Sequence, residues 1–221
     1  IHHSDNPTGF SDLALLYLNH NEINKAIEIL LPASKQFRSN YMIQFLTGLV
    51  LNQTDNKISA IPFYERALVL SPGSRNAMHN LAILYDSIKS WTKSDSLYKI
   101  LISTDTTDAQ AFNNFAYSLV ERNEQLNFAL ELSRKAVQLV PESAAYLDTM
   151  GWVLFMIGNN TMALDYIKQS IEIENDNAIV LEHLGDVYKA DNKILDAKIY
   201  WKKAFHIDPE NEDLEKKIGA P

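Results

Sequence analysis

The chain has no cysteine in its 221 residues. A disulfide framework, a thiol nucleophile and thiolate metal ligands are therefore excluded, while an oxidising or a reducing compartment remains compatible. Apolar residues never run for the roughly 18 positions that a membrane-spanning helix needs, so we expect no membrane span in this segment. Because the chain starts at Ile1 rather than methionine, we expect the natural start to be missing, and the sequence does not identify the compartment.

A clustered basic surface is the second absence. Lysine and arginine number 20 against 28 aspartate and glutamate residues, which gives a formal net charge of -8. Short basic runs such as Lys202-Lys203 and Lys216-Lys217 stand beside acidic residues and are typical of solvated helix faces. Because binding of a polyanion requires clustered cations, we predict no nucleic-acid partner.

Catalytic motifs are the third absence. The sequence contains no glycine loop for a phosphate, no His-Glu-x-x-His helix and no serine nucleophile elbow. Asp148, Glu182 and Asp186 form the densest acidic set. Such carboxylates could serve in acid–base chemistry or hold a cation, but a solvated or ligand-facing acidic surface is the simpler interpretation. His79 and His183 have no evident ligand partners, and we predict no catalytic residue, cofactor or metal site.

The chain does have an internal repeat of about 34 residues. Six copies follow one another in phase, and the fourth has one extra residue. The copies span 7–40, 41–74, 75–108, 109–143, 144–177 and 178–211. The eighth position of each copy is small, and a second small residue recurs in its second half. The first set is Ala14, Gly48, Ala82, Ala116, Gly151 and Gly185, and the second is Ala26, Ala60, Ser94, Ala129, Ala163 and Ala197.

Large residues accompany the small ones at spacings of three, four and seven, which place them on one face of a helix. Each copy is therefore predicted to form two antiparallel helices. Glycine inside a helix costs about 1 kcal/mol relative to alanine, so Gly48, Gly151 and Gly185 need a compensating benefit. We expect a bulky side chain of the paired helix to pack over each of these glycines.

Some segments depart from the repeat. Pro32 and Pro62 fall inside the predicted second helices of the first two copies, where we expect kinks or late helix starts. Residues 1–6 are interpreted as a tail or the end of a preceding segment. Residues 212–221 are predicted to form a short capping helix and tail, with Leu214 and Ile218 covering the exposed apolar edge of the last copy.

The last copy carries the fullest pattern, which comprises Leu184, Gly185, Tyr188, Ala197, Trp201, Ala204 and Pro209. This pattern resembles the tetratricopeptide repeat, and the resemblance covers about nine tenths of the chain. It implies an all-α fold, a right-handed superhelical solenoid of six helix-turn-helix repeats that ends in the short capping helix. It also implies that certain positions on the first helices line a concave groove that binds a partner.

In the third and fourth copies these groove positions are occupied mainly by amides. The residues are Asn76, His79, Asn80, Gln110, Asn113 and Asn114. Amide side chains donate and accept hydrogen bonds together, so a row of them can hold the backbone of an extended peptide whatever its sequence. The alternative is a solvated polar helix face in a chain that is rich in asparagine.

Farther along the chain, the groove positions combine aromatic rings with carboxylates. The residues are Tyr117, Asp148, Trp152, Phe155, Glu182 and Asp186. This combination suits a segment that carries an apolar anchor and a basic residue. Trp152 has an alternative place, packed between helices.

The run from Tyr146 to Phe155, together with Leu181 to Tyr188, is similar to repeats of bacterial envelope tetratricopeptide proteins, which are often lipoproteins that serve as adaptors. This resemblance favours the bacterial periplasm or an outer-membrane association over the cytoplasm. Our leading hypothesis is a non-enzymatic scaffold or adaptor that binds a protein or peptide partner in its groove. The alternatives are a substrate-docking or regulatory segment of a larger enzyme, and a scaffold that self-associates through its end repeats.

Overall fold

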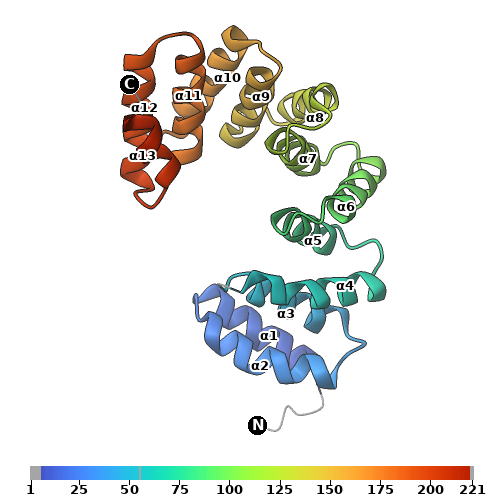
Figure 1. Cartoon of the computed structure of the whole chain (residues 1–221). Helices are drawn as coiled ribbons and strands as arrows, with labels where there is room; N and C mark the ends of the chain where they lie inside the picture. Colours follow the sequence, from blue (N-terminus) through green and yellow to red (C-terminus); the bar gives the residue numbers. More distant parts are fainter. Residues whose placement is uncertain (1–5, 55, 220–221) are drawn as a thin grey trace. The chain divides into compact units, whose positions relative to one another are not determined.

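The computed structural model describes residues 6–54 and 56–219, and every regular element in this part of the chain is helical (Figure 1). The predicted all-α repeat fold is confirmed. The helices are α1 (Pro7–Asn19), α2 (Ile23–Gln36), α3 (Tyr41–Leu51), the 3-10 helix η1 (Lys57–Ala60), α4 (Ile61–Leu70), α5 (Arg75–Ser87), α6 (Trp91–Thr104), α7 (Ala109–Glu121), α8 (Leu126–Leu139), α9 (Ala144–Met156), α10 (Asn160–Ile173), α11 (Ala178–Ala190), α12 (Ile194–Ile207) and α13 (Glu212–Gly219). Of the predicted N-terminal tail, 1–6, residues 1–5 lie outside the described residues and Asn6 caps α1; the last two residues of the predicted segment 212–221 also lie outside them.

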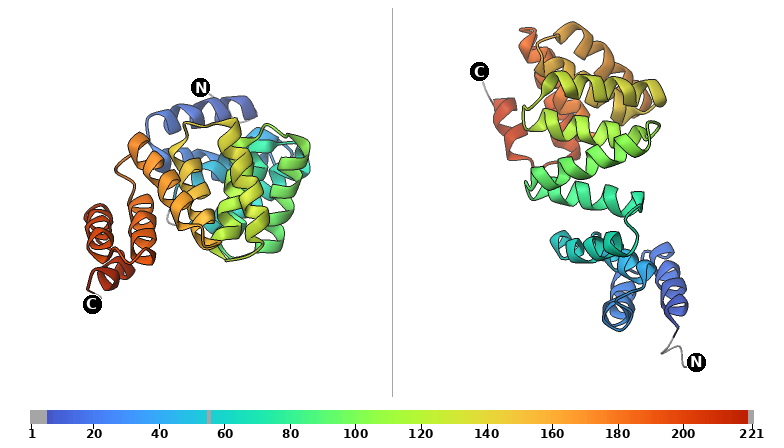
Figure 2. Two further views of the ribbon diagram at one scale, coloured as in Figure 1. Left: turned by 90° about the horizontal axis from the view of Figure 1, so that it is seen from above. Right: turned by 90° about the vertical axis from the view of Figure 1, so that its right-hand side faces the viewer.

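The helices are arranged as consecutive pairs, and the first helix of each pair begins at the first residue of one of the six sequence copies. The chain forms two compact units, Ile1–Thr104 with α1–α6 and Asp105–Pro221 with α7–α13. Within each unit, the two helices of a pair contact each other, and the second helix contacts the first helix of the next pair (Figure 2). Helix α13 packs on α12 at the end of the second unit.

The three helical glycines lie where a paired helix approaches most closely. A Cβ atom on Gly48 would stand 2.9 Å from the Tyr64 ring, and one on Gly151 would stand 2.5 Å from Cγ1 of Ile167. A Cβ atom on Gly185 would collide with the Trp201 indole. Because each partner side chain is buried, the expected benefit of these glycines is confirmed: they admit a bulky neighbour.

A left-handed residue makes the turn between the two helices of five pairs. Asn21, Lys89, Asn123, Gly158 and Asn192 have φ between 55° and 87°. Asparagine and glycine tolerate this conformation better than other residues do, which explains their recurrence here. The extra residue of the fourth copy falls in the same turn, where a second left-handed residue, Gln125 with φ 47°, precedes α8.

The two unusual prolines have different outcomes. Pro62 lies at the start of α4, after the 3-10 helix η1, so the expected late helix start is confirmed. Pro32, in contrast, lies inside α2, which begins at Ile23 and continues past the proline to Gln36. The helix tolerates Pro32 because the ring lies on an exposed part of its surface, where a lost backbone bond can be replaced by solvent.

Capping residues explain much of the asparagine content. The side chains of Asn6, Asn40, Ser74, Asp108 and Asn177 each accept a hydrogen bond from a backbone N–H in the first turn of a first helix. Asn211 does the same for α13. These residues stand one position before each helix, at the same place in successive repeats. Many of the asparagines therefore fix helix starts rather than face a partner.

Candidate functional site

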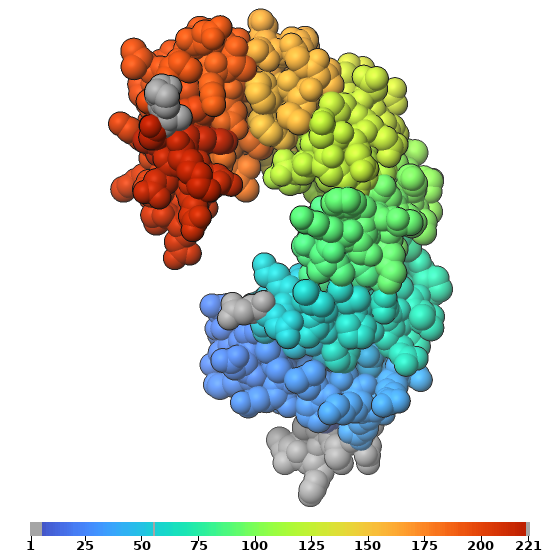
Figure 3. Space-filling model, viewed as in Figure 1, coloured from blue at the N-terminus to red at the C-terminus, as the bar shows by residue number. Residues whose placement is uncertain are grey.

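Nine of the twelve predicted groove residues lie in the second unit, on the first helices α7, α9 and α11. Helix α9 contacts both α7 and α11. In the space-filling view, the helix pairs of this unit pack tightly against one another (Figure 3). We call the surface at which these three helices meet the first-helix face, and define it by Asn113, Asn114, Tyr117, Glu121, Trp152, Phe155 and His183.

Trp152 joins α9 to α7. Its indole Nε1–H donates a hydrogen bond of 2.9 Å to the Glu121 carboxylate. Its ring stacks on Phe155, with 5.1 Å between centroids and 26° between planes. Since Asn114, Tyr117 and Glu121 are three and four residues apart, they lie along one stripe of α7, and the bond to Trp152 places that stripe beside the aromatic pair.

A buried histidine–aspartate pair joins α9 to α11. Nδ1 of His183 lies 3.0 and 3.1 Å from the two Asp148 carboxylate oxygens, and both residues are about nineteen-twentieths buried. The Trp152 ring stacks on the His183 imidazole, with 4.0 Å between centroids. Asp148 therefore fixes the His183 ring, and the His183 ring in turn supports one face of the Trp152 indole. Asp148 was expected to face a ligand, but its two oxygens have an internal partner.

The other two predicted carboxylates hold the C-terminal helix. Nζ of Lys217 on α13 donates to Glu182 at 2.5 Å and to Asp186 at 2.7 Å. Asn211 donates to Glu182 and the Trp201 indole to Asp186. Burial alone lowers the pKa of Lys217, but its hydrogen bonds and charge interactions with these two carboxylates outweigh burial and leave the pKa above its ordinary value of 10.5. A basic residue of a partner would have to displace Lys217 to reach these acids.

The amides of α7 leave one buried acceptor unsatisfied. Asn113 is 7% exposed, and its Nδ2 donates to Oδ1 of Asn114 at 3.4 Å. Within the described part of the chain, Oδ1 of Asn113 has no hydrogen-bond partner. Gln110 is exposed on the same helix, one turn before Asn113 and Asn114. Because this oxygen is itself covered, it is a costly unpaired acceptor within the helix packing rather than a group open to a partner.

The remaining three predicted residues form a separate set on α5 in the first unit. Nδ2 of Asn80 donates to the backbone oxygen of Asn76 at 2.8 Å, and Asn76 is exposed. His79 is 8% exposed and therefore largely buried. Within the second unit, the structure gathers the amides and aromatics of α7 and α9 into one surface.

Two residues of this surface were not predicted from the sequence. His183 showed no partner, because Asp148 is 35 residues away and becomes a neighbour only when α9 and α11 pack side by side. Glu121 stands at the end of α7, 31 residues from Trp152. Both separations are close to one repeat length, and this is the signal that could have indicated them.

The described residues were compared with the requirements of a metal site and of a membrane-spanning helix. Across residues 6–54 and 56–219, no group of three or more histidine, aspartate or glutamate side chains is arranged to hold a metal ion. Over the same residues, none of the helices combines the length and the apolar character needed to cross a bilayer.

No family model matches the chain. Five curated relatives match it in sequence, two of them from one bacterium. A TPR repeat-containing protein of Pseudomonas aeruginosa is 25% identical over 158 residues, which cover 71% of this chain and 27% of the relative. The type IV pilus assembly protein PilF of the same organism is 23% identical over 157 residues, which cover 70% of this chain and 62% of PilF. The chain thus spans less than two thirds of either relative.

The fold is also found among solved structures. YrrB, described as a TPR protein with an unusual peptide-binding site, matches 86% of this chain and 98% of its own, with a TM-score of 0.60 and 18% identity. Proteins built from such repeats act as protein-interaction scaffolds. Six phased copies, glycines covered by large side chains, paired helices and these likenesses agree that the chain is an array of tetratricopeptide repeats.

Proposed function

We propose that this protein is a non-enzymatic scaffold that binds an extended segment of a protein partner across the first-helix face of the second unit. One observation carries the proposal. Trp152 is fixed on three sides, by Glu121 of α7, by His183 of α11 and by Phe155 of its own helix. A partly exposed aromatic side chain held in one orientation is a preorganised anchor, because little side-chain entropy is lost when a partner packs on it.

Amide groups next to this anchor supply backbone recognition. Asn114 is partly exposed and Gln110 is exposed, and each amide can both donate a hydrogen bond to a peptide backbone and accept one from it. Main-chain recognition of this kind is indifferent to side-chain sequence. The aromatic rings of Trp152 and Phe155 then select a segment with an apolar residue.

A basic residue in the partner is the third element of the proposal. Glu121 is exposed and lies at the edge of the aromatic pair, so a lysine or arginine of the segment can approach it without displacing any internal cation. Glu182 and Asp186 are less suited to this role, since Lys217 bridges them.

Affinity capture with the intact chain as bait tests this function. The double substitution Asn114→Ala with Tyr117→Ala should reduce recovery of the specific partner by at least about tenfold, the loss expected when a binding hot spot is truncated. A matched variant, Glu131→Ala with Gln138→Ala on exposed positions of α8, should recover as much as the parent chain. Circular dichroism must show equal melting temperatures. Equal recovery by both variants would refute the first-helix face as the binding surface.

We further propose that the protein serves as an adaptor in a bacterial envelope. The likeness to a type IV pilus assembly protein supports this location, in line with the similarity of the run from Tyr146 to Phe155 to envelope repeats. Fractionation of the source cells with an antibody to the protein tests it: recovery with the periplasm or outer membrane is expected, and recovery only with the cytoplasm would contradict it.

A further inference from the structure

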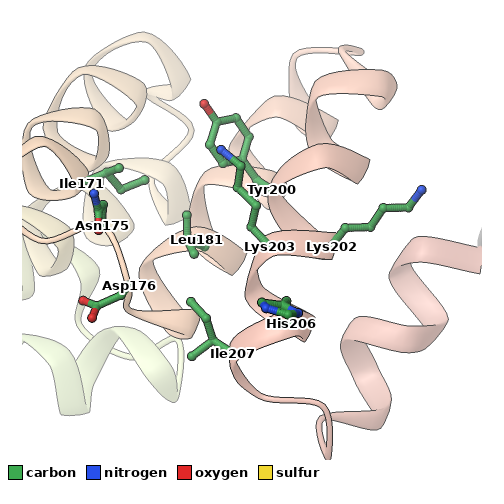
Figure 4. A pocket seen from close by; sticks show the side chains of 9 residues that line it. All are labelled: Ile171, Asn175, Asp176, Leu181, Tyr200, Lys202, Lys203, His206 and Ile207. Atoms are coloured by element: carbon green, nitrogen blue, oxygen red, sulfur yellow. The ribbon is translucent and has the colours of Figure 1, made fainter.

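A recessed surface lies between the second helices α10 and α12, and none of the residues that define the first-helix face lines it. It is a pocket of about 550 Å³ whose walls come from α10, the loop before α11, the start of α11 and α12 (Figure 4). Its lining includes Ile171 of α10, the buried Leu181 of α11 and the exposed Ile207 of α12. These side chains provide an apolar lining that is large enough for one or two side chains of a partner.

The α12 wall of the pocket is basic and aromatic. Lys203 extends beside Tyr200, with its ammonium 5.0 Å from the centre of the ring, and His206 follows one turn later (Figure 4). Lys202 is directed away from the other lining side chains in the same view. Among the described residues, neither Lys203 nor His206 has an ion-pair partner.

The opposite wall offers acceptors. Asn175 and Asp176, in the loop between α10 and α11, line the pocket and are exposed. Their side-chain oxygens can accept hydrogen bonds from backbone N–H groups. The pocket therefore has hydrogen-bond acceptors on the side of the loop and an apolar lining between its walls. On the side of α12 it has Lys203, a cation without an ion-pair partner in the described residues.

The first unit has a smaller recess at the equivalent position, between α2 and α4, four repeats earlier in the chain. Phe63 stands where Tyr200 stands in the second unit, and Arg66 stands where Lys203 stands. Lys35 and Arg38 add two further cations there, and no ion pair involves them or Arg66 in the described residues. Although the chain has a net charge of -8, the pocket between α10 and α12 and the recess between α2 and α4 are each lined by a basic residue and an aromatic residue.

We propose that the pocket between α10 and α12 binds an acidic peptide segment with an apolar side chain. The apolar side chain enters between Ile171 and Ile207, a neighbouring carboxylate meets Lys203, and the backbone of the segment donates to the loop at Asp176. Charge complementarity selects this occupant, since a carboxylate gains a charge-assisted hydrogen bond from a lysine that has no carboxylate partner among the described residues. This surface is independent of the first-helix face and of the partner proposed for it.

Titration of the isotope-labelled full chain with a defined probe tests the proposal by NMR. The probe is an acetylated pentapeptide amide of sequence Glu-Asp-Phe-Leu-Asp, and its control carries Gln and Asn in place of the acids. The acidic probe should shift amide signals of residues 171–181 and 200–207 at millimolar concentration, and the neutral control should bind at least about fivefold more weakly because it lacks the charge.

Two variants locate the contact. Lys203→Glu should weaken binding of the probe by about tenfold or more, since it puts a like charge beside the carboxylate. Ile207→Asn, on an exposed position, should weaken it as well by removing apolar lining. Lys198→Glu makes the same charge change on α12 outside the pocket and should have less than about a twofold effect. Absence of binding, shifts confined to the first-helix face, or equal weakening by Lys203→Glu and Lys198→Glu would each overturn the proposal.

Discussion

At the scale of single residues, the fold depends on where side chains are missing as much as on where they are present. Trp201 is 2% exposed and lies against Gly185, and Tyr64 is fully buried against Gly48. Each ring occupies the space that a Cβ atom would take. Interiors pack at the density of organic crystals, so these contacts leave no room for an added methyl group.

Gly185→Leu should therefore destabilise the protein by at least about 1 to 3 kcal/mol, because the new side chain meets the rigid, buried Trp201 indole. Chemical denaturation followed by circular dichroism measures the free energy of unfolding. Gly73→Ala is the control, since nothing lies within 4 Å of a Cβ atom at Gly73, and it should change stability little. A neutral Gly185→Leu variant would mean that α11 and α12 do not pack in the described register.

The residue scale also shows what the sequence could and could not indicate. The small positions were predictable, since periodicity reports which residues face a neighbouring helix. The pairs Asp148 with His183 and Lys217 with Asp186 were not, because a period specifies the face of a helix but not which charged groups meet across it. Their formation depends on packing between repeats, and three of the four residues had been assigned to solvent or ligand.

At the scale of elements, five of the six first helices begin with a side-chain cap, and α9 does not. Oδ1 of Asn177 lies 3.0 Å from the amide nitrogen of Ile179 at the start of α11. Ser143 stands at the same place before α9, yet its side chain makes no capping bond. The two positions therefore provide a comparison within one protein.

Asn177→Ala should cost about 1 kcal/mol of stability, because it leaves backbone N–H groups of the first turn without their acceptor. Ser143→Ala should lower the free energy of unfolding by only about 0.3 kcal/mol, because no capping bond is lost. Thermal and denaturant unfolding of the two variants measure the difference. Equal losses would show that the side-chain bond of Asn177 contributes nothing to the start of α11.

The capping helix α13 is held by the buried Leu214, by the partly buried Ile218 that packs on the same cluster, as expected, and by the cation of Lys217. Lys217→Gln should loosen α13, seen as faster hydrogen exchange of residues 212–219, because two part-buried carboxylates lose their counter-ion. Lys216→Gln is the matched control, since Lys216 pairs with Asp213 on a largely exposed surface. Such exposed pairs contribute little. Similar exchange in both variants would remove Lys217 as the anchor of α13.

At the scale of the whole molecule, alkaline pH acts on several groups in the same direction. Burial raises the pKa of Tyr64 and Tyr98 above the ordinary value of 10.0, and the pKa of Lys217 lies above 10.5. Above about pH 10 the unfolded chain therefore binds fewer protons at these groups than the folded chain does. Stability should be fully present below pH 10 and should fall as pH rises further, which denaturant titrations at several pH values can check. A free energy of unfolding that stays constant between pH 9 and 11 would contradict this expectation.

The architecture of the whole chain was largely readable from its period, down to the residues at which the first helices begin. The position of the binding surface was only partly readable. Amides such as Asn113 and Asn177 look alike in a sequence, but one leaves an oxygen unsatisfied on a helix face and the other caps a helix. Only the packing of successive pairs separates these two uses.

Site-specific photocrosslinking in the source cells tests the central claim, binding on the first-helix face, most directly. A photoreactive amino acid replaces Asn114 in one variant and Glu131, on the exposed side of α8, in another. Crosslinking of a partner through position 114, with little through position 131, is the predicted result. Crosslinking of that partner through position 131, and none through position 114, would contradict the claim that the first helices bind it.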